Sequence, residues 1–210
     1  YQFNYLGRAN RLSLRIEHKT EDYEQRGTAS FFGDPNQNLD AKTDSFASEY
    51  RYVGDRFNFS LSGRHDNNSE FDDSDSWRMT GNFKLPQATL FASVGESIKN
   101  PTFTERFGFF TNFIGNPDLE PEESLHWEIG ARTSLLNDKL DLALTYFDAN
   151  LENEINGFVF DFETGGYTSG NIDGESERKG VEMELRYAQS EQFDLKATYT
   201  YLDATQQDFN

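Results

Sequence analysis

The sequence predicts an all-β protein, in which about ten antiparallel strands run up and down as the wall of a transmembrane β-barrel. Three observations predict this fold class. Apolar and polar residues alternate with a period of two, short turns alternate with long loops, and charged side chains recur on one face of the alternating stretches. Each element follows from these patterns.

Ten stretches of alternating residues account for the predicted strands. In 140–146, for example, Leu140, Leu142, Leu144 and Tyr146 occupy every second position, as expected for a strand with one apolar face. The predicted strands are 1–5, 12–16, 46–52, 57–61, 77–83, 90–94, 125–131, 140–146, 181–187 and 193–201.

The connections between these strands alternate in length without exception. Short turns lie at 7–10, 54–55, 85–87, 137–138 and 189–192, and long polar loops lie at 20–43, 66–75, 97–123 and 150–178. An up-and-down sheet with this order has all its tight turns at one end and all its long loops at the other, as outer-membrane barrels do. Greek-key connections of a soluble sandwich mix both lengths at both ends.

The polar face of the strands also favours a barrel. It carries Glu128, Arg132, Glu182, Glu184, Arg186, Asp194 and Lys196. Charges inside a packed sandwich have a large desolvation cost, whereas a wet lumen within a lipid-facing barrel accommodates them. The alternative is a half-buried soluble sheet whose charges face bulk water, as in a soluble β-sheet binding module.

Composition excludes several classes of protein. The net charge of −18 argues against nucleic acid as a partner, because phosphates would be repelled. It suits a surface that meets divalent cations or neutral or cationic ligands, or it serves solubility alone. The absence of cysteine excludes disulfides and thiolate chemistry. No apolar run approaches the roughly 20 residues of a membrane helix.

Several motifs follow one another between residues 90 and 203. The segment GNPDLEPEESLHWEIG fits the pattern N-P-x-L-x-P-E-x-S-x-x-x-E through Asn116, Pro117, Asp118, Leu119, Pro121, Glu122, Ser124 and Glu128. Lys99, Pro101, Phe103 and Glu105 form an upstream motif, and Asn171, Lys179, Gly180, Val181 and Glu182 form a downstream one. Together these motifs resemble the TonB-dependent receptor family. Within that family, their sequences are most similar to those of the cobalamin-receptor-like members.

The resemblance implies a 22-stranded barrel in the outer membrane of a Gram-negative bacterium, filled by an N-terminal plug. Such a barrel contacts the lipid bilayer and lipopolysaccharide. It binds a scarce small-molecule ligand, of the cobalamin or metal–siderophore class, among its outer loops, and the inner-membrane TonB complex drives import through the plug. Residues 1–210 would then be a partial barrel domain that lacks the plug and the final strands. We therefore expect an excerpt of a receptor.

The motif residues have a structural interpretation. Pro117 and Pro121 lack backbone donors and are expected to hold the chain extended where it re-enters the sheet. Asn116 and Asp118 are turn formers. Gly180, next to a long strand, indicates a bend or a bulge. These residues are expected to shape the barrel rather than to contact ligand.

Two loops contain candidate functional residues, one for binding a metal ion and one for contact with an imported molecule. The acidic group Asp66, Glu70, Asp72, Asp73 and Asp75 has oxygen donors that calcium prefers, but without the fixed spacing of an EF-hand, so a solvated loop is favoured over a metal site. The loop 97–123 is rich in phenylalanine. Its candidates for ligand contact are Phe103, Phe109, Phe110 and Phe113, with packing onto the barrel as the favoured role. The loop 150–178 is expected to form a hairpin.

The sequence contains no catalytic constellation. His18, His65 and His126 lie on separate strands with no matching metal or triad spacing, so neither an enzyme nor a bound cofactor is predicted. A complete ten-stranded outer-membrane barrel enzyme is the alternative, since ten is an even number of strands. It would need acidic and histidine residues gathered at the rim.

Overall fold

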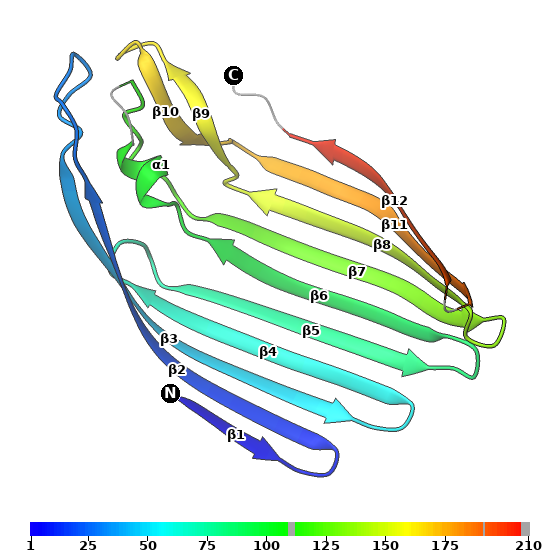
Figure 1. Cartoon of the computed structure of the whole chain (residues 1–210). Helices are drawn as coiled ribbons and strands as arrows, with labels where there is room; N and C mark the ends of the chain where they lie inside the picture. The colour runs from blue at the N-terminus through cyan, green and yellow to red at the C-terminus, as the bar shows by residue number, and fades with distance from the viewer. Residues whose placement is uncertain (109–111, 191, 207–210) are drawn as a thin grey trace.

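The computed structural model describes residues 1–108, 112–190 and 192–206. Ten strands form one antiparallel sheet, in which each strand pairs with the next along the chain and β11 lies beside β8. Strands β9 and β10 form a separate hairpin between β8 and β11 (Figure 1). This arrangement confirms the predicted ten-stranded up-and-down sheet and the hairpin within 150–178.

The strands have the following bounds: β1 (Gln2–Leu6), β2 (Asn10–Gln25), β3 (Gln37–Val53), β4 (Phe57–Asn68), β5 (Ser74–Lys84), β6 (Thr89–Lys99), β7 (Glu122–Leu135), β8 (Leu140–Glu152), β9 (Ile155–Asp161), β10 (Gly166–Asn171), β11 (Glu175–Ser190) and β12 (Phe193–Thr205). One helix, α1 (Phe103–Phe107), lies between β6 and β7. Among the described residues, no helix is long and apolar enough to cross a membrane.

All long connections lie at one end of the sheet and all tight turns at the other (Figure 1). We call these the loop end and the turn end. The long connections are loop 1 (26–36), loop 2 (69–73), loop 3 (100–121) and loop 4 (153–174), the last containing the β9–β10 hairpin.

Loop 1 is shorter than the predicted range of 20–43. Strands β2 and β3 stay paired without interruption from Asn10↔Tyr52 to Gln25↔Gln37. Beyond Ile16, polar residues predominate on both faces of this ladder, so the regular apolar alternation that predicts a strand is lost. Main-chain hydrogen bonds nevertheless continue the pairing, because they do not depend on the side chains.

The two faces of the sheet differ in chemistry. On one face, apolar side chains such as Met79, Ile129, Leu144 and Met183 are each about half exposed. On the other face, small and charged residues prevail, and the hollows of the sheet lie there, lined for example by Arg64 and Arg186. The polar face is therefore the concave, inner face, and the apolar face is the convex, outer one.

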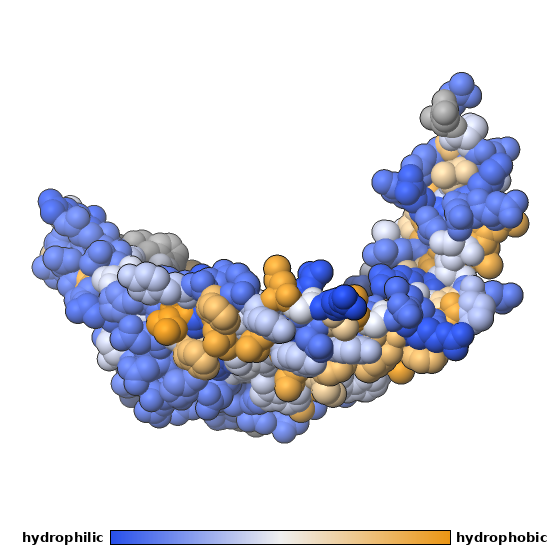
Figure 2. Space-filling model, turned by 90° about the horizontal axis from the view of Figure 1, so that it is seen from below, coloured by the Kyte–Doolittle hydropathy of each residue, from blue (hydrophilic) through white to orange (hydrophobic). Residues whose placement is uncertain are grey.

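The sheet curves into a crescent and does not close on itself (Figure 2). Strands β1 and β12 are its two edges, and each pairs with one neighbour only. A closed ten-stranded barrel, the architecture of the enzyme alternative, is therefore not formed by these strands. The curvature is that of a barrel wall.

Of the two features that the sequence indicates at Gly180, a bend or a bulge, the bulge is not formed. Strand β11 keeps a regular register through Gly180 with both β8 and β12. A Cβ atom at this position would lie 2.1 Å from the carbonyl oxygen of Tyr201 and 2.8 Å from the ring of Phe147. Glycine is required because the Phe147 ring, from the paired position on β8, lies across it.

Candidate functional site

The described hydrophobic core lies at the loop end rather than within the sheet. Among the described residues, the buried apolar side chains are Phe113, Leu119 and Ile172, each at most 3% exposed. Phe113 and Leu119 belong to loop 3, and Ile172 belongs to loop 4. The loops thus pack on one another around a small core of their own, which makes this end the candidate functional site.

Helix α1 gives loop 3 a fixed start. The hydroxyl of Thr102 accepts a hydrogen bond from the Glu105 amide, and the Glu105 carboxylate accepts one from the Thr102 amide at 2.7 Å. This reciprocal pair is a capping box. The helix lies within a range predicted as open loop, and the Thr102–Glu105 spacing is the signal in the sequence that indicates it.

Loop 3 is tied to the extended β2–β3 ladder. The ring of Tyr23 stacks on Phe103 with centroids 5.2 Å apart. The Tyr23 hydroxyl donates to the carbonyl of Gly108, and the Gln37 side chain donates to the carbonyl of Phe107 at 2.9 Å. The strand extension beyond the apolar band therefore serves as a support for α1.

The segment of loop 3 that leads into β7 forms a turn. The side chain of Asn116 accepts a hydrogen bond from the amide of Asp118 at 3.0 Å, as predicted for these turn formers. Pro117 lies within this turn, so its predicted extended role is wrong, whereas Pro121 lies directly before β7. A turn suits Pro117 because its fixed φ is that of a turn's second residue.

Glu122 and Asn171 join this segment to loop 4. The Glu122 carboxylate accepts from the amide of Ile155 at 2.8 Å and pairs with Lys99 at 2.9 Å. Asn171 bonds both the amide and the carbonyl of Glu120, each at 2.9 Å. These contacts join the end of loop 3 to loop 4, and a structural rather than ligand-binding role for the motif stays a prediction.

The other motif residues lie in the sheet. Ser124, Glu128, Gly180 and Glu182 all occupy the inner face. Glu128 accepts from Ser93 at 2.8 Å and contacts Arg78 at 3.4 Å. These four residues therefore lie apart from the motif residues that make the contacts between loops 3 and 4.

Glu122 offers a test of the two kinds of contact at this junction. Its side chain is 13% exposed, whereas Lys99 is 55% exposed. We expect Glu122→Gln, which keeps an acceptor for Ile155, to cost under about 1 kcal/mol, since exposed ion pairs contribute little. Glu122→Ala leaves the Ile155 amide unpaired and should cost about 1–3 kcal/mol. Urea unfolding of the full-length protein measures both, and equal losses would contradict the assignment.

The acidic candidates for a calcium site are dispersed. Asp66 lies on the inner face with Arg64, Glu70 binds Arg106 at 3.1 Å, and Asp75 binds His65 at 2.9 Å. Asp73 accepts from Asn67, and Asp72 is exposed. Within 1–108, 112–190 and 192–206, no group of three or more His, Cys, Asp or Glu side chains could hold a metal ion.

The aromatic candidates of loop 3 are packed against other elements. Phe103 stacks on Tyr23, and Phe113 stacks on Phe158 of the hairpin at 5.4 Å. Phe109 and Phe110 lie outside the described residues. More exposed aromatic rings occur at positions that sequence reasoning did not select, namely Phe31 in loop 1 and Phe162 at the hairpin, which are 93% and 90% exposed.

The loop end carries almost the whole net charge. The ranges 18–44, 66–75, 99–123 and 148–179 contain 24 acidic and seven basic residues, a net charge of −17 out of −18. The remaining residues, which form most of the strands and the turn end, carry a net charge of only −1. A strongly negative mouth attracts cations and repels anions at a distance of about a Debye length, roughly 8 Å at physiological salt.

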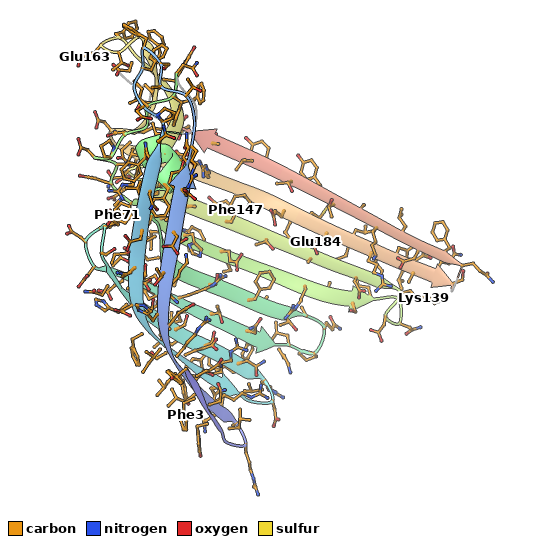
Figure 3. All side chains as sticks on the ribbon, turned by 60° about the vertical axis from the view of Figure 1, so that its left-hand side comes forward. Phe3, Phe71, Lys139, Phe147, Glu163 and Glu184 are labelled. Atoms are coloured by element: carbon orange, nitrogen blue, oxygen red, sulfur yellow. The ribbon has the colours of Figure 1, made fainter. Side chains whose placement is uncertain are left out.

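The hairpin tip contains a carboxylate whose ionisation stabilises the turn. The Thr164 hydroxyl and the Glu163 amide both donate to Asp161, at 2.7 and 2.9 Å, and hold the pKa of this carboxyl below its ordinary 3.8. Glu163 marks this tip in Figure 3, far from Lys139 at the turn end.

We expect the hairpin tip to loosen at low pH. A lowered pKa in the folded state stabilises the turn above about pH 3.8 and loses this effect as the pH falls through the lowered value. Pepsin cleavage near Phe160 and Phe162 in the full-length protein, normalised to a reference peptide, should therefore rise between pH 4 and pH 2. Asp161→Asn is the control, and an identical rise in this variant would contradict the prediction.

The family model described as TonB dependent receptor-like, beta-barrel matches residues 1–210. The chain belongs to this family. The match covers every strand of the sheet and all four loops. The ordered motifs from Lys99 to Glu182 thus identified the family correctly.

Solved structures of two receptors and one transporter share this fold. The siderophore receptor PirA from Pseudomonas aeruginosa superposes with a TM-score of 0.81 at 18% identity, over 98% of this chain and 42% of that one. The ferric enterobactin receptor PfeA from the same species, in complex with enterobactin, gives 0.76 at 18% identity, over 96% and 34%. The copper transporter OprC gives 0.77 at 13% identity, over 97% and 36%. The chain spans less than half the length of each of these three proteins.

Proposed function

We propose that this chain forms part of the barrel wall and four extracellular loops of an outer-membrane receptor. The receptor imports a scarce ligand with energy from the TonB complex, and its ligand is of the metal–siderophore or cobalamin class. The observation that carries the proposal is the convergence of all four long loops at one end of the wall, where loops 3 and 4 share a small core, in a chain that matches the family over its whole length.

The outer face supports a position in the membrane. In β12, the outward side chains Phe193, Leu195, Ala197, Tyr199 and Tyr201 form an apolar row of nine residues, about 26 Å long at the usual strand rise. A strand that crosses a bilayer at a tilt needs roughly 9–11 residues. Contiguous exposed apolar surface of this extent suits lipid contact.

The ligand class rests on the nature of the similar receptors and on charge. PirA is a siderophore receptor, and PfeA is a ferric enterobactin receptor. The negative loop end favours a neutral or cationic complex over a strongly anionic one. Of the two classes, metal–siderophore import has the support of the similar structures, and cobalamin import is an outcome that the test distinguishes.

Uptake by the full-length receptor tests the proposal. We expect a Gram-negative strain that carries this receptor as its sole TonB-dependent receptor to accumulate one labelled ferric chelate or labelled cobalamin. Accumulation should cease when the TonB complex is deleted. The control is the same strain without the receptor gene. Equal accumulation with and without the TonB complex, or none from a panel of cationic, neutral and anionic chelates and cobalamin, would overturn the proposal.

A further inference from the structure

Loop 3 contacts each of the other three loops or the strands that carry them. Tyr23 and Gln37 hold it at the base of loop 1. On the hairpin side, the amide of Ile114 donates to the carbonyl of Tyr167 at 2.9 Å, and the hydroxyl of Thr168 donates to the carbonyl of Gly115 at 2.9 Å. Loop 3 is therefore the centre of the cluster, through its described parts 100–108 and 112–121.

Among the described residues of loop 3, Arg106 makes the connection to loop 2. Arg106 of α1 donates to the carboxylate of Glu70 at 3.1 Å, and its guanidinium lies over the rings of Phe71 and Phe107, 4.8 and 4.9 Å from their centroids. The Arg106 side chain is 11% exposed. Figure 3 shows Phe71 near α1 at the loop end.

A buried cation in this place has a specific consequence. Removal of a guanidinium from water is costly unless a carboxylate and aromatic faces replace the solvent, and here the carboxylate and one of the two rings come from loop 2. If loop 2 moves away from α1, Arg106 loses its counter-charge and one of its two rings together. The contact is therefore either complete or broken, which is the behaviour of a latch.

We propose that Arg106 is a positioning residue that latches loop 3 onto loop 2, so that the four loops move as one unit. Loop 1 and the hairpin follow because they are attached to the same segment through Tyr23 and Tyr167. The four loops at the loop end then keep one fixed arrangement relative to one another. The proposal does not depend on which ligand the receptor imports.

Distances between spin labels in the full-length receptor test this coupling. Labels are attached at Asp72→Cys in loop 2 and Glu163→Cys at the hairpin tip, both exposed positions. Residues 1–210 contain no cysteine, and any cysteine elsewhere in the receptor is replaced by serine. We expect a narrow distance distribution in the otherwise unaltered protein. Arg106→Gln should widen it at least twofold, and Arg106→Lys should restore it in part, because lysine keeps the charge but not the planar fork.

Two controls separate a latch from general stabilisation. Arg26→Gln removes an 82% exposed arginine that pairs with Glu24, and it should leave the distribution unchanged. The urea midpoint of the barrel should also stay unchanged, because Arg106 lies outside the strand ladder. If Arg106→Gln does not fold, Glu70→Gln breaks the same ion pair at a more exposed side chain. An unaltered width in the folded variant, or equal widening by Arg26→Gln, would overturn the proposal.

Discussion

Replacing Gly180 with valine is expected to prevent β11 from pairing with β12 or to destabilise the barrel by about 3 kcal/mol or more, at or above the range for overpacked sites. The reason is geometric. An added Cβ would lie 2.1 Å from a main-chain oxygen of β12, which cannot move without breaking the ladder, and 2.8 Å from the Phe147 ring, which fills the inner face.

The effect of Gly180→Val is measured by urea unfolding of the full-length protein and by the heat-modifiable migration of its folded form on gels. Gly157→Ala is the matched control, because a Cβ atom there meets nothing within 4 Å. This control should change the free energy of unfolding by less than about 0.5 kcal/mol. Gly130→Val should resemble Gly180→Val, since the ring of Phe91 lies 2.3 Å from the corresponding Cβ position. Normal folding of both valine variants would contradict the structure.

Replacing Asn171 with alanine is expected to detach the β9–β10 hairpin from the segment that leads into β7. The Asn171 side chain makes three hydrogen bonds, two to Glu120 and one to the carbonyl of Asn153 at 2.7 Å. At about 1 kcal/mol each, their loss amounts to roughly 2–3 kcal/mol of local stability. The strand ladder should remain intact, because these bonds lie outside it.

Hydrogen exchange of amides in loop 4, together with limited proteolysis, measures this local loosening in the full-length protein. Asn171→Asp keeps the acceptor for the Glu120 amide but loses both donated bonds. The amide protection of loop 4 in this variant should therefore lie between that of the native protein and that of Asn171→Ala. Asn4→Ala is the control, since the Asn4 side chain accepts a hydrogen bond from Gln2 at 3.1 Å and lies on β1, at the opposite edge of the sheet from loop 4. Protection of loop 4 that is the same in all variants would show that Asn171 does not hold the hairpin.

The sheet was predictable from the sequence wherever one face of a strand is apolar. Leu140, Leu142 and Leu144 mark β8 because the outer face of the wall requires apolar residues at every second position. The same rule cannot mark the upper part of β2, where Lys19 and Glu21 alternate with other polar residues. There, main-chain hydrogen bonds continue the pairing, together with polar contacts such as His18 with Asp44 at 2.6 Å, so the strands extend further than the apolar alternation predicts.

The loop end was predictable only in part. Turn formers such as Asn116 act on neighbouring residues, and their local hydrogen bonds follow from the sequence. Arg106 and Glu70 are 36 residues apart, and their contact arises only when two loops fold against each other. Likewise, Gly180 alone does not distinguish a bulge from a site for a ring, because the deciding residue, Phe147, lies on another strand.

The small core shared by Phe113, Leu119 and Ile172 bears on how such receptors diverge. Because side chains from loops 3 and 4 bury one another, neither loop can be exchanged alone without exposing half of that core. Recombination between relatives is therefore expected to transfer 100–121 and 153–174 as a pair. A chimaera that carries both from one parent should keep its fold, whereas one that mixes parents should not.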